Sequence, residues 1–340
     1  MSRGSAAGGA PGRARQARRV LVAAALSLTM AVAAIGGAVV YEYWHLDGNI
    51  TTAGDLNTLT HRPKELPPPP NGGPPINILL LGSQTRDGQQ GQFGDSAATG
   101  SFGGSLGTDN SDTSMLLHLA GDRKHAMVVS IPRDTMVARP ECPGRNGDQV
   151  IPASDRAIFD SAMSLGGPLC AAATVEQMWN VRVDDFIRLD FNGFRKIVTY
   201  LGGVQVCIPP PGIDDPYSHL KLPAGLHVVT GDEALAFVRD RHGIGDGSDL
   251  GRIKMQQMFL SSLVAKVESD GTLQDPGRLL ALADVATSSV TTDVGLGSVD
   301  RLLGLANEPE GDDADMNREK DLATMDLDDL VNAAFLDDDD

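Results

Sequence analysis

Apolar runs of strand length recur along the chain, and between them lie stretches in which apolar residues return every three or four positions. The runs of the first kind predict β-strands at Ile76–Gly82, Met115–Ala120, Ala126–Ile131, Asp185–Asp190 and Val204–Ile208. A Gly-Asp-Arg-Lys segment joins the second and third runs and indicates a β-hairpin. Three prolines follow the last run and are expected to end it.

The stretches with helical spacing predict α-helices at Ala157–Leu165, Ala171–Trp179, Phe191–Leu201, Gly231–Phe237 and Leu250–Glu268. A Gly-Gly-Pro sequence separates the first two, and two glycines end the third. Because strands and helices alternate, the pattern predicts an α/β fold, a layered α-β-α domain with a central mixed sheet.

A further apolar run, Val20–Val40, contains no charged residue and is long enough to cross a bilayer. Arginines precede it and, by the positive-inside rule, keep the start of the chain in the cytoplasm. We therefore expect one transmembrane helix, a single-pass type II anchor in the cell membrane with the domain on the extracytoplasmic side. The alternative is a cleaved signal peptide, for which Ala31–Ala33 offers small residues.

These patterns divide the chain into segments, with order expected to begin at Ile76. The expected organisation is a basic cytoplasmic tail (1–19), a transmembrane anchor (20–41), an extracytoplasmic segment with a proline-rich linker (42–75), a folded domain (76–306) and an acidic disordered tail (307–340). Residues 88–111, rich in glycine and serine, are expected to form a mobile loop.

The chain has 340 residues and a formal net charge of −17, which argues against general nucleic-acid binding because phosphate neutralisation needs excess lysine and arginine. Three cysteines fit an exported domain. Cys142 and Cys170 flank a loop-rich stretch and could form a disulfide, or all three thiols could be free. Cys207 lies in an apolar run and is expected to be a buried, inert thiol.

Arginines gather in one segment of this acidic chain. Arg239 and Arg241 end the apolar run Ala234–Val238, and at a two-residue period they would point to the same side of a strand. Asp249 then opens a helix in which Arg252 and Gln256 lie one turn apart on one face. Guanidinium groups bind phosphate oxygens through two hydrogen bonds at once, so we expect a diphosphate pocket. The alternative is a solvated loop with ordinary Arg–Asp pairs.

Two more charged groups lie at predicted strand ends. Arg133 comes directly after the strand Ala126–Ile131, where α/β sheets commonly bind ligands. Asp112 precedes the strand Met115–Ala120, and a carboxylate beside phosphate is how Mg²⁺ is usually held. Each signal is weak alone: such an arginine is often structural, and such an aspartate often caps a turn.

Together these groups resemble the LytR-CpsA-Psr family of membrane-anchored phosphotransferases over about residues 76–268. The resemblance is carried, in this order, by Asn77-Ile78-Leu79-Leu80-Leu81-Gly82 with Thr85-Arg86, Ser111-Asp112-Thr113, Ser130-Ile131-Pro132-Arg133-Asp134, Gly202-Gly203-Val204, the segment Ala234 to Arg241, and Asp249-x-x-Arg252 with Gln256.

The resemblance implies transfer of a glycopolymer from a polyprenyl-diphosphate carrier to peptidoglycan through a phosphodiester, with Mg²⁺ (or Mn²⁺) at the diphosphate. The residues it assigns to catalysis are Arg133, Arg239, Arg241, Asp249 and Arg252. Those it assigns to substrate binding are Arg86, Arg133, Arg239, Arg241, Arg252 and Gln256. Asp112 matches a metal ligand, and Gln84 stands where the family usually has a second, aspartate ligand.

Two further departures from the family pattern are a missing lysine and a missing final strand. Ile158 stands near a frequent family lysine, so that one phosphate contact is expected to be lost, and no clear final strand follows Val267. Two rival functions stay open at this point. The same pocket could serve a polyprenyl-diphosphate hydrolase, with water replacing the sugar hydroxyl, or a non-catalytic scaffold that only binds the carrier lipid.

Overall fold

The computed structural model describes residues 11–65, 68, 73–83, 111–145, 149–216, 218–240, 249–272 and 274–306. The chain divides into two compact units, residues 1–48 and 49–340. The first unit holds the helix α1 (Pro11–Asn49) except for its last residue, and this helix contains the predicted anchor. Its stretch Leu26–Asn49 is long and apolar enough to cross a membrane, and the side chains of residues 26–40 within it are exposed. This helix is a candidate membrane anchor.

The second unit is built on a mixed six-stranded sheet of order β1-β12-β9-β2-β3-β4. Its strands are β1 (Thr51–Thr52), β2 (Ile76–Ser83), β3 (Ser111–Leu119), β4 (Ala126–Ile131), β9 (Asp185–Asp190) and β12 (Val290–Thr292). The strand β2 runs parallel to β9 and antiparallel to β3, which forms the predicted hairpin with β4. The central mixed sheet predicted from the sequence is therefore confirmed.

This topology sorts the strand ends into two edges. Because β2, β4 and β9 run in one direction and β3 in the other, the last residues of the former meet the first residue of the latter. We call this the carboxyl edge and define it by Ser83, Ile131, Asp190 and Ser111. The amino edge, at the other end of the same strands, is defined by Ile76, Ala126 and Asp185. The two edges carry different groups of polar residues.

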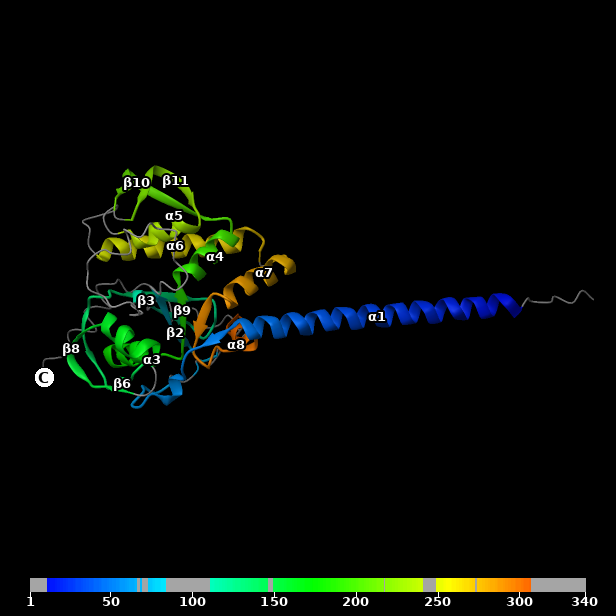
Figure 1. Cartoon of the computed structure of the whole chain (residues 1–340), viewed down its shortest axis with the longest axis horizontal. Coiled ribbons are helices and arrows are strands. Elements are labelled where there is room, and N and C mark those ends of the chain that lie inside the picture. Colours follow the sequence, from blue (N-terminus) through cyan, green and yellow to red (C-terminus); the bar gives the residue numbers. More distant parts are fainter. Residues whose placement is uncertain are drawn as a thin grey trace, which may run out of the picture. The chain divides into compact units, whose positions relative to one another are not determined.

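Helices cover both faces of the sheet (Figure 1). On one face, α3 (Asp160–Trp179) packs its buried side chains against Leu79, Leu81 and Phe186 of the sheet to form a first core. On the other lie α4 (Phe191–Tyr200), α5 (Gly231–Arg239) and α6 (Asp249–Ser269). The antiparallel ribbon β10–β11 (Val204–Asp215 and Leu220–Val229) packs on these helices and closes a second core. The α-β-α layering predicted from the sequence is thus confirmed.

Smaller elements complete the unit: the 3₁₀ turn η1 (Leu56–Thr58), the pair β5–β8 (Met136–Arg139 and Ser154–Ile158), the pair β6–β7 (Cys142–Pro143 and Val150–Ile151), α7 (Pro276–Thr287) and α8 (Val299–Ala306). A disulfide joins Cys142 of β6 to Cys170 of α3, with 5.2 Å between the Cα atoms. It therefore fastens the small β6–β7 pair to the helix beneath the sheet.

Three expectations about local structure were wrong. The strand β10 continues through the three prolines, because its pairing with β11 shifts between Ile208 and Gly212 and leaves the prolines outside the ladder, where no N–H is needed. Cys207 is exposed, because Val206 and Ile208 on either side of it face the core and side chains alternate along a strand. Arg239 ends a helix, α5, and not a strand.

Two helix and strand boundaries also differ from the sequence pattern. The two helices expected at 157–165 and 171–179 form one run, α3, with a kink at Gly167, whose φ of 70° suits a glycine, and Ile158 belongs to β8. The ordered unit also starts before Ile76: β1 pairs with β12, and Leu56 lies in the first core. The strand β12 supplies the late strand that the sequence did not reveal.

Candidate functional site

The carboxyl edge of the sheet holds the charged residues that the sequence analysis singled out. Arg133 lies two residues beyond the end of β4, as expected. Its side chain is 28% exposed, and its Nε is 3.5 Å from the Asp134 carboxylate. Its backbone carbonyl accepts a hydrogen bond from the amide of Asp160, the first residue of α3 (3.0 Å). The edge of the sheet thus positions Arg133 by both its strand and the neighbouring helix.

Asp112 lies at an irregularity in β3. The register pairs Gly82 with Thr113 and Ser83 with Ser111, so Asp112 is the extra residue of a β-bulge at the carboxyl edge. Bulges redirect the strand locally and often occur next to functional sites. The contacts of the Asp112 carboxylate lie outside the described part of the chain.

Gln256 connects three parts of this edge. Its side-chain amide donates hydrogen bonds to Thr113 Oγ1 (2.8 Å) and to the carbonyl of Val238 (3.0 Å). Its side chain comes from α6 and is 8% exposed. The neighbouring Gln257 donates to Ser130 Oγ of β4 (3.4 Å). The helix α6 is therefore tied to the start of β3, to β4 and to the end of α5.

Arg239 is the last residue of α5 and lies beside this edge. Its guanidinium stands over the ring of Phe191, with 4.7 Å between Cζ and the ring centroid. Phe191 is the first residue of α4 and directly follows Asp190, where β9 ends. A guanidinium on an aromatic face is held by electrostatic attraction, and a cation at the C-terminus of a helix is also stabilised by the helix dipole. Arg239 is thus held at the carboxyl edge.

The structure brings some of the predicted site residues together and leaves others undescribed. Arg133, Arg239, Gln256 and the backbone of Asp112 lie at the carboxyl edge, on β4, α5, α6 and β3. Arg252 lies one turn before Gln256 on α6 and is 3% exposed. Gln84, Arg86, Arg241 and the side chain of Asp249 fall outside the described residues. The site assignments as a whole stay a prediction.

Two residues at this edge were missed by the sequence analysis, Phe191 and Asp160. Phe191 supports Arg239, and its signal was its place directly after a predicted strand. Asp160 accepts a hydrogen bond from the backbone N–H of Ser111 (2.9 Å), next to the Asp112 bulge. Ile158, where the family often has lysine, is 46% exposed at the end of β8 and brings no charge to the edge.

A divalent cation at the carboxyl edge stays a prediction. The backbone of Asp112 lies next to Ser111, whose N–H donates to Asp160, and Mg²⁺ prefers carboxylate and other oxygen donors while keeping several waters. Within the described residues no three His, Cys, Asp or Glu side chains cluster as a metal site would require. A cation here would thus depend on Asp112 with water and phosphate oxygens, and Gln84 is the other predicted ligand.

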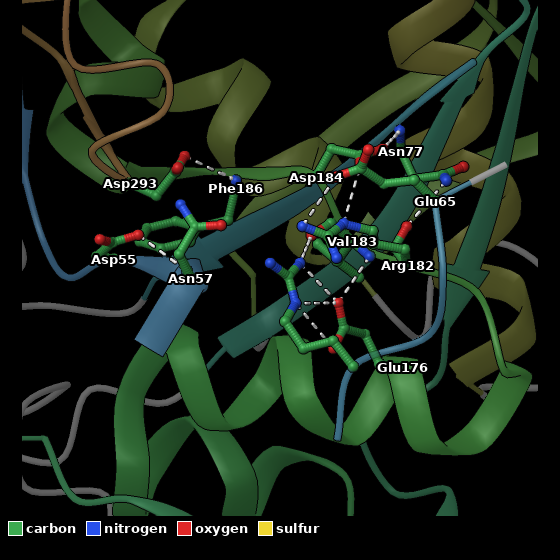
Figure 2. A network of polar contacts seen from close by, with 11 residues as sticks. Asp55, Asn57, Glu65, Asn77, Glu176, Arg182, Val183, Asp184, Phe186 and Asp293 are labelled. Carbon is green, nitrogen blue, oxygen red and sulfur yellow. Dashed lines mark hydrogen bonds and ion pairs between the residues drawn. The ribbon is translucent and has the colours of Figure 1, made fainter. Parts of the chain in front are cut away.

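The amino edge of the same sheet carries a different polar network (Figure 2). Arg62 pairs with Glu176 of α3 (2.8 Å) and donates to the carbonyl of Val183, whose N–H in turn donates to Glu176 (2.9 Å). Asp184 accepts from the backbone N–H of Asn77 in β2 (2.9 Å). These contacts join the segment before β2, the helix α3 and the start of β9, so the network fastens the fold together.

Two neighbouring carboxyl groups, Asp185 and Asp293, lie beside this network and next to Asp184. Burial raises the pKa of Asp185 to about 7, and the negative charges of Asp293 and Asp184 add to the shift. Burial also raises the pKa values of Asp184 and Asp293. Asp293 accepts from the backbone N–H groups of Phe186 (3.2 Å) and Gly295 (2.7 Å). The two edges therefore differ: buried carboxylates with raised pKa values crowd together at the amino edge, beside the Arg62–Glu176 pair, and the predicted site residues that the structure describes lie at the carboxyl edge.

These features define a chain of the LytR_cpsA_psr family. A model of that family matches residues 47–326, which is most of the chain, so the chain belongs to it and the resemblance seen in its motifs is confirmed.

Particular relatives agree with this assignment. The chain is 33% identical over 234 residues to the cell wall biosynthesis protein LcpA of Corynebacterium glutamicum, covering 64% of this chain and 45% of that protein. It is 29% identical over 228 residues to the polyisoprenyl-teichoic acid–peptidoglycan teichoic acid transferase TagU of Oceanobacillus iheyensis, covering 67% of this chain and 62% of that protein. The chain thus spans about half of the length of these relatives.

Solved structures show the same fold. The LytR-Csp2A-Psr enzyme from Actinomyces oris superposes with a TM-score of 0.53 at 19% sequence identity, covering 76% of this chain and 80% of that one. At this identity the likeness concerns the fold alone.

Proposed function

We propose that this chain transfers a glycopolymer from a polyprenyl-diphosphate carrier to peptidoglycan and so acts as a phosphotransferase in cell-wall assembly. The observation that carries the proposal is the grouping of Arg133, Arg239 and Gln256 at one sheet edge in a chain of this family. The name of the TagU relative, which describes teichoic acid transfer to peptidoglycan, supports the substrate class.

The reaction makes one bond and breaks another. A sugar hydroxyl oxygen of the acceptor attacks the phosphorus that bears the polymer, and the P–O bond to the lipid phosphate breaks, so that the lipid phosphate leaves with the electron pair. The hydroxyl proton passes to a base that we do not assign. Phosphoryl transfer depends chiefly on positioning and on charge neutralisation, which arginines supply.

In this proposal Arg133 and Arg239 bind the diphosphate oxygens, together with Arg252. The family resemblance assigns Arg241 and Arg86 to the same task. Gln256 braces α6 against β3 and α5 and contributes to the same pocket. Asp249 orients the arginines of its segment.

A divalent cation completes the site in this proposal. Mg²⁺ or Mn²⁺, when bound, neutralises negative charge on the diphosphate. Asp112 would hold it, with Gln84 as the weaker ligand because its amide oxygen carries no charge.

The location follows from the first unit of the chain. Arginines precede the apolar part of α1, and the positive-inside rule then supports a type II anchor with the second unit outside the cytoplasm. The Cys142–Cys170 disulfide fits an oxidising compartment. The membrane then also supplies the lipid-linked donor.

The test uses the full chain in detergent with a labelled lipid-linked glycopolymer donor and peptidoglycan as the acceptor. The wild type is expected to form a conjugate, to lose activity with EDTA and to regain it with Mg²⁺. Arg239→Ala is expected to lower the rate on the order of a hundredfold or more, because one charge-stabilising group is lost. The control is Arg278→Ala, which removes an exposed arginine of α7 that pairs with Asp275.

Other outcomes would contradict the proposal in distinct ways. Normal transfer by Arg239→Ala would remove the central site assignment. Release of labelled polymer phosphate without any conjugate would favour a hydrolase. Binding of the donor with no turnover under any condition would favour a scaffold that holds the carrier lipid.

A further inference from the structure

Asp160 lies where two of the site-bearing segments meet. It is the first residue of α3 and follows Phe159, a fully buried residue of the first core. Its backbone N–H donates to the carbonyl of Arg133 (3.0 Å), and the preceding N–H, of Phe159, donates to the carbonyl of Thr135 (2.9 Å). The segment after β4 is therefore attached to the start of α3 at two successive amides.

The side chain of Asp160 reaches a second segment. Its Oδ1 accepts from the backbone N–H of Ser111 (2.9 Å). Ser111 is 1% exposed, and its hydroxyl bonds to the carbonyl of Thr113 (2.7 Å) and to Ser114 Oγ (3.1 Å), which span the bulge. Asp112 is the residue between Ser111 and Thr113, which the 2.7 Å hydrogen bond joins. One side chain thus fixes the backbone on which the predicted metal ligand stands.

A carboxylate is well suited to this task. A hydrogen bond from a backbone N–H to a charged acceptor is shorter and roughly twice as strong as one to a neutral acceptor. The start of a helix also favours a negative charge. Bulges interrupt the regular ladder, so a bulged strand gains rigidity when an outside group receives one of its N–H groups.

We propose that Asp160 is a positioning residue, which holds the Asp112 bulge and the Arg133 segment in fixed relation so that a cation and a diphosphate can be bound together. This proposal deepens the proposed function and rests on it for the identity of the ligand. It does not require Asp160 to touch the substrate. The essential property is an acceptor oxygen at the position of Oδ1, which the negative charge strengthens and which asparagine also offers.

The experiment compares three variants of the full chain in detergent. Asp160→Ala removes the acceptor, and Asp160→Asn keeps an oxygen acceptor without the charge. Asp184→Ala is the matched control, because Asp184 accepts a strand N–H, that of Asn77, over the same 2.9 Å at the opposite edge of the same sheet. Two quantities are measured: the Kd for inorganic pyrophosphate with Mg²⁺ by calorimetry, and amide hydrogen exchange of a peptide that contains the Ser111 amide in its interior.

The expected results separate the variants. Asp160→Ala raises the exchange rate at the start of β3 on the order of tenfold and weakens pyrophosphate binding by about tenfold to a hundredfold, since small misplacements of a site are costly. Asp160→Asn restores both quantities to within about threefold of wild type. Asp184→Ala raises exchange at the start of β2 and leaves the Kd unchanged. If Asp160→Ala does not fold, Asp160→Ser, which shortens the acceptor, replaces it.

Three results would overturn the inference. The first is unchanged exchange at Ser111 in Asp160→Ala. The second is an equal loss of affinity in Asp160→Asn and Asp160→Ala, which would assign the effect to charge and point to direct cation binding. The third is an equal loss in Asp184→Ala, which would make the effect a general one.

A failure of the proposed function would look different. If the wild type itself does not bind pyrophosphate, that function loses its support and the exchange measurement alone decides about Asp160. Faster exchange confined to the start of β3 and restored by asparagine would support the positioning role, and unchanged exchange would end it.

Discussion

Arg62 and Glu176 form a buried ion pair, in which 8% and 5% of the two side chains are exposed. Arg62 also donates to the carbonyl of Val183, so its guanidinium meets both a charge and a backbone acceptor. A buried pair of this kind stabilises little relative to a well-packed apolar pair, but losing one partner leaves the other buried and uncompensated. The pair is therefore sensitive to single substitutions.

We expect Arg62→Met to lower the free energy of unfolding by about 3–5 kcal/mol, because the carboxylate of Glu176 stays buried without its cation. The measurement is urea denaturation followed by far-UV circular dichroism. The control, Lys221→Met, removes a pair with Asp214 in which both side chains are largely exposed, and it should leave the midpoint unchanged. Equal effects of the two substitutions would show that burial of the ion pair does not determine the loss of stability.

The Asp185 carboxyl predicts how stability depends on pH. Burial and the neighbouring Asp293 and Asp184 raise its folded pKa to about 7, while Arg301 opposes the shift. An unfolded aspartate titrates near 3.9, so between about pH 4 and 7 the folded state binds more protons than the unfolded state. Stability is therefore expected to fall as pH rises through this window, and to stay low above it.

Calorimetric melting of the wild type and Asp185→Asn between pH 5 and 8 checks this expectation. The wild-type melting temperature should fall as the carboxyl ionises, and the asparagine variant should lose much of that dependence and melt higher than wild type at pH 8. Gly295 packs tightly here, since a Cβ on it would lie 2.4 Å from Asp185 Oδ1 and 2.5 Å from Asp293 Oδ2. Parallel melting curves for the two proteins would contradict the assignment.

At the scale of elements, α4 shows how closely the site is built onto the sheet. It starts at Phe191, immediately after β9, and Asp190 caps it by accepting from the N–H of Gly193 (2.7 Å). Gly193 lies against the segment before β12: a Cβ there would be 2.6 Å from the carbonyl oxygen of Ser289 and 2.9 Å from Leu189 Cδ1. The helix can lie this close only because that position has no side chain.

We therefore expect Gly193→Ala to destabilise the second unit by about 1–3 kcal/mol, since either the helix or the β12 segment must move. The alanine gains some helix propensity, but less than the clash costs. Chemical denaturation measures the effect. Gly37→Ala in α1, where a new Cβ meets nothing within 4 Å, is the comparison and should not change unfolding of this unit. An unchanged free energy of unfolding in Gly193→Ala would show that α4 or the segment before β12 moves at little energetic cost.

Elements with a strong local pattern could be predicted from the sequence. The apolar runs of β2, β4 and β9 and the spacing of α4 and α6 gave nearly the observed boundaries. Short strands could not be found in this way, because β1 and β12 have two and three residues and are defined by the partner with which they pair. The path of β10 through its prolines also depends on the shifted pairing with β11.

Some residues of the candidate site could likewise be predicted from the sequence, and others could not. Arg133, Arg239 and Gln256 were chosen because of their side-chain chemistry and their places in motifs, and both are visible in a sequence. Asp160 and Phe191 were missed, because their roles come from contacts with Ser111 and Arg239, far away along the chain. For Arg239 the sequence allowed two interpretations, a strand end after the apolar run Ala234–Val238 and a helix at Gly231–Phe237, and packing in the second core decides for the helix.

At the scale of the whole molecule, the chain combines an apolar helix with a compact second unit that contains both cores. We expect the full chain to sediment with membranes and to stay there after alkaline carbonate extraction, because the apolar stretch of α1 buries its side chains in lipid. A chain comprising residues 49–340 should stay in the soluble fraction as a folded protein. Release of the full chain by carbonate would indicate that α1 does not span the bilayer.

The sheet keeps its arginine-bearing carboxyl edge and its carboxylate-rich amino edge at opposite ends of the same strands. A consequence concerns how the protein can be improved for use as a reagent. More stable variants can be sought among substitutions of Asp185 and its neighbours without changing the residues proposed to recognise the donor. Changes of donor preference can be sought at the carboxyl edge of a variant that has already been stabilised at the amino edge. The effects of the two sets of substitutions are expected to add, because the two edges are far apart.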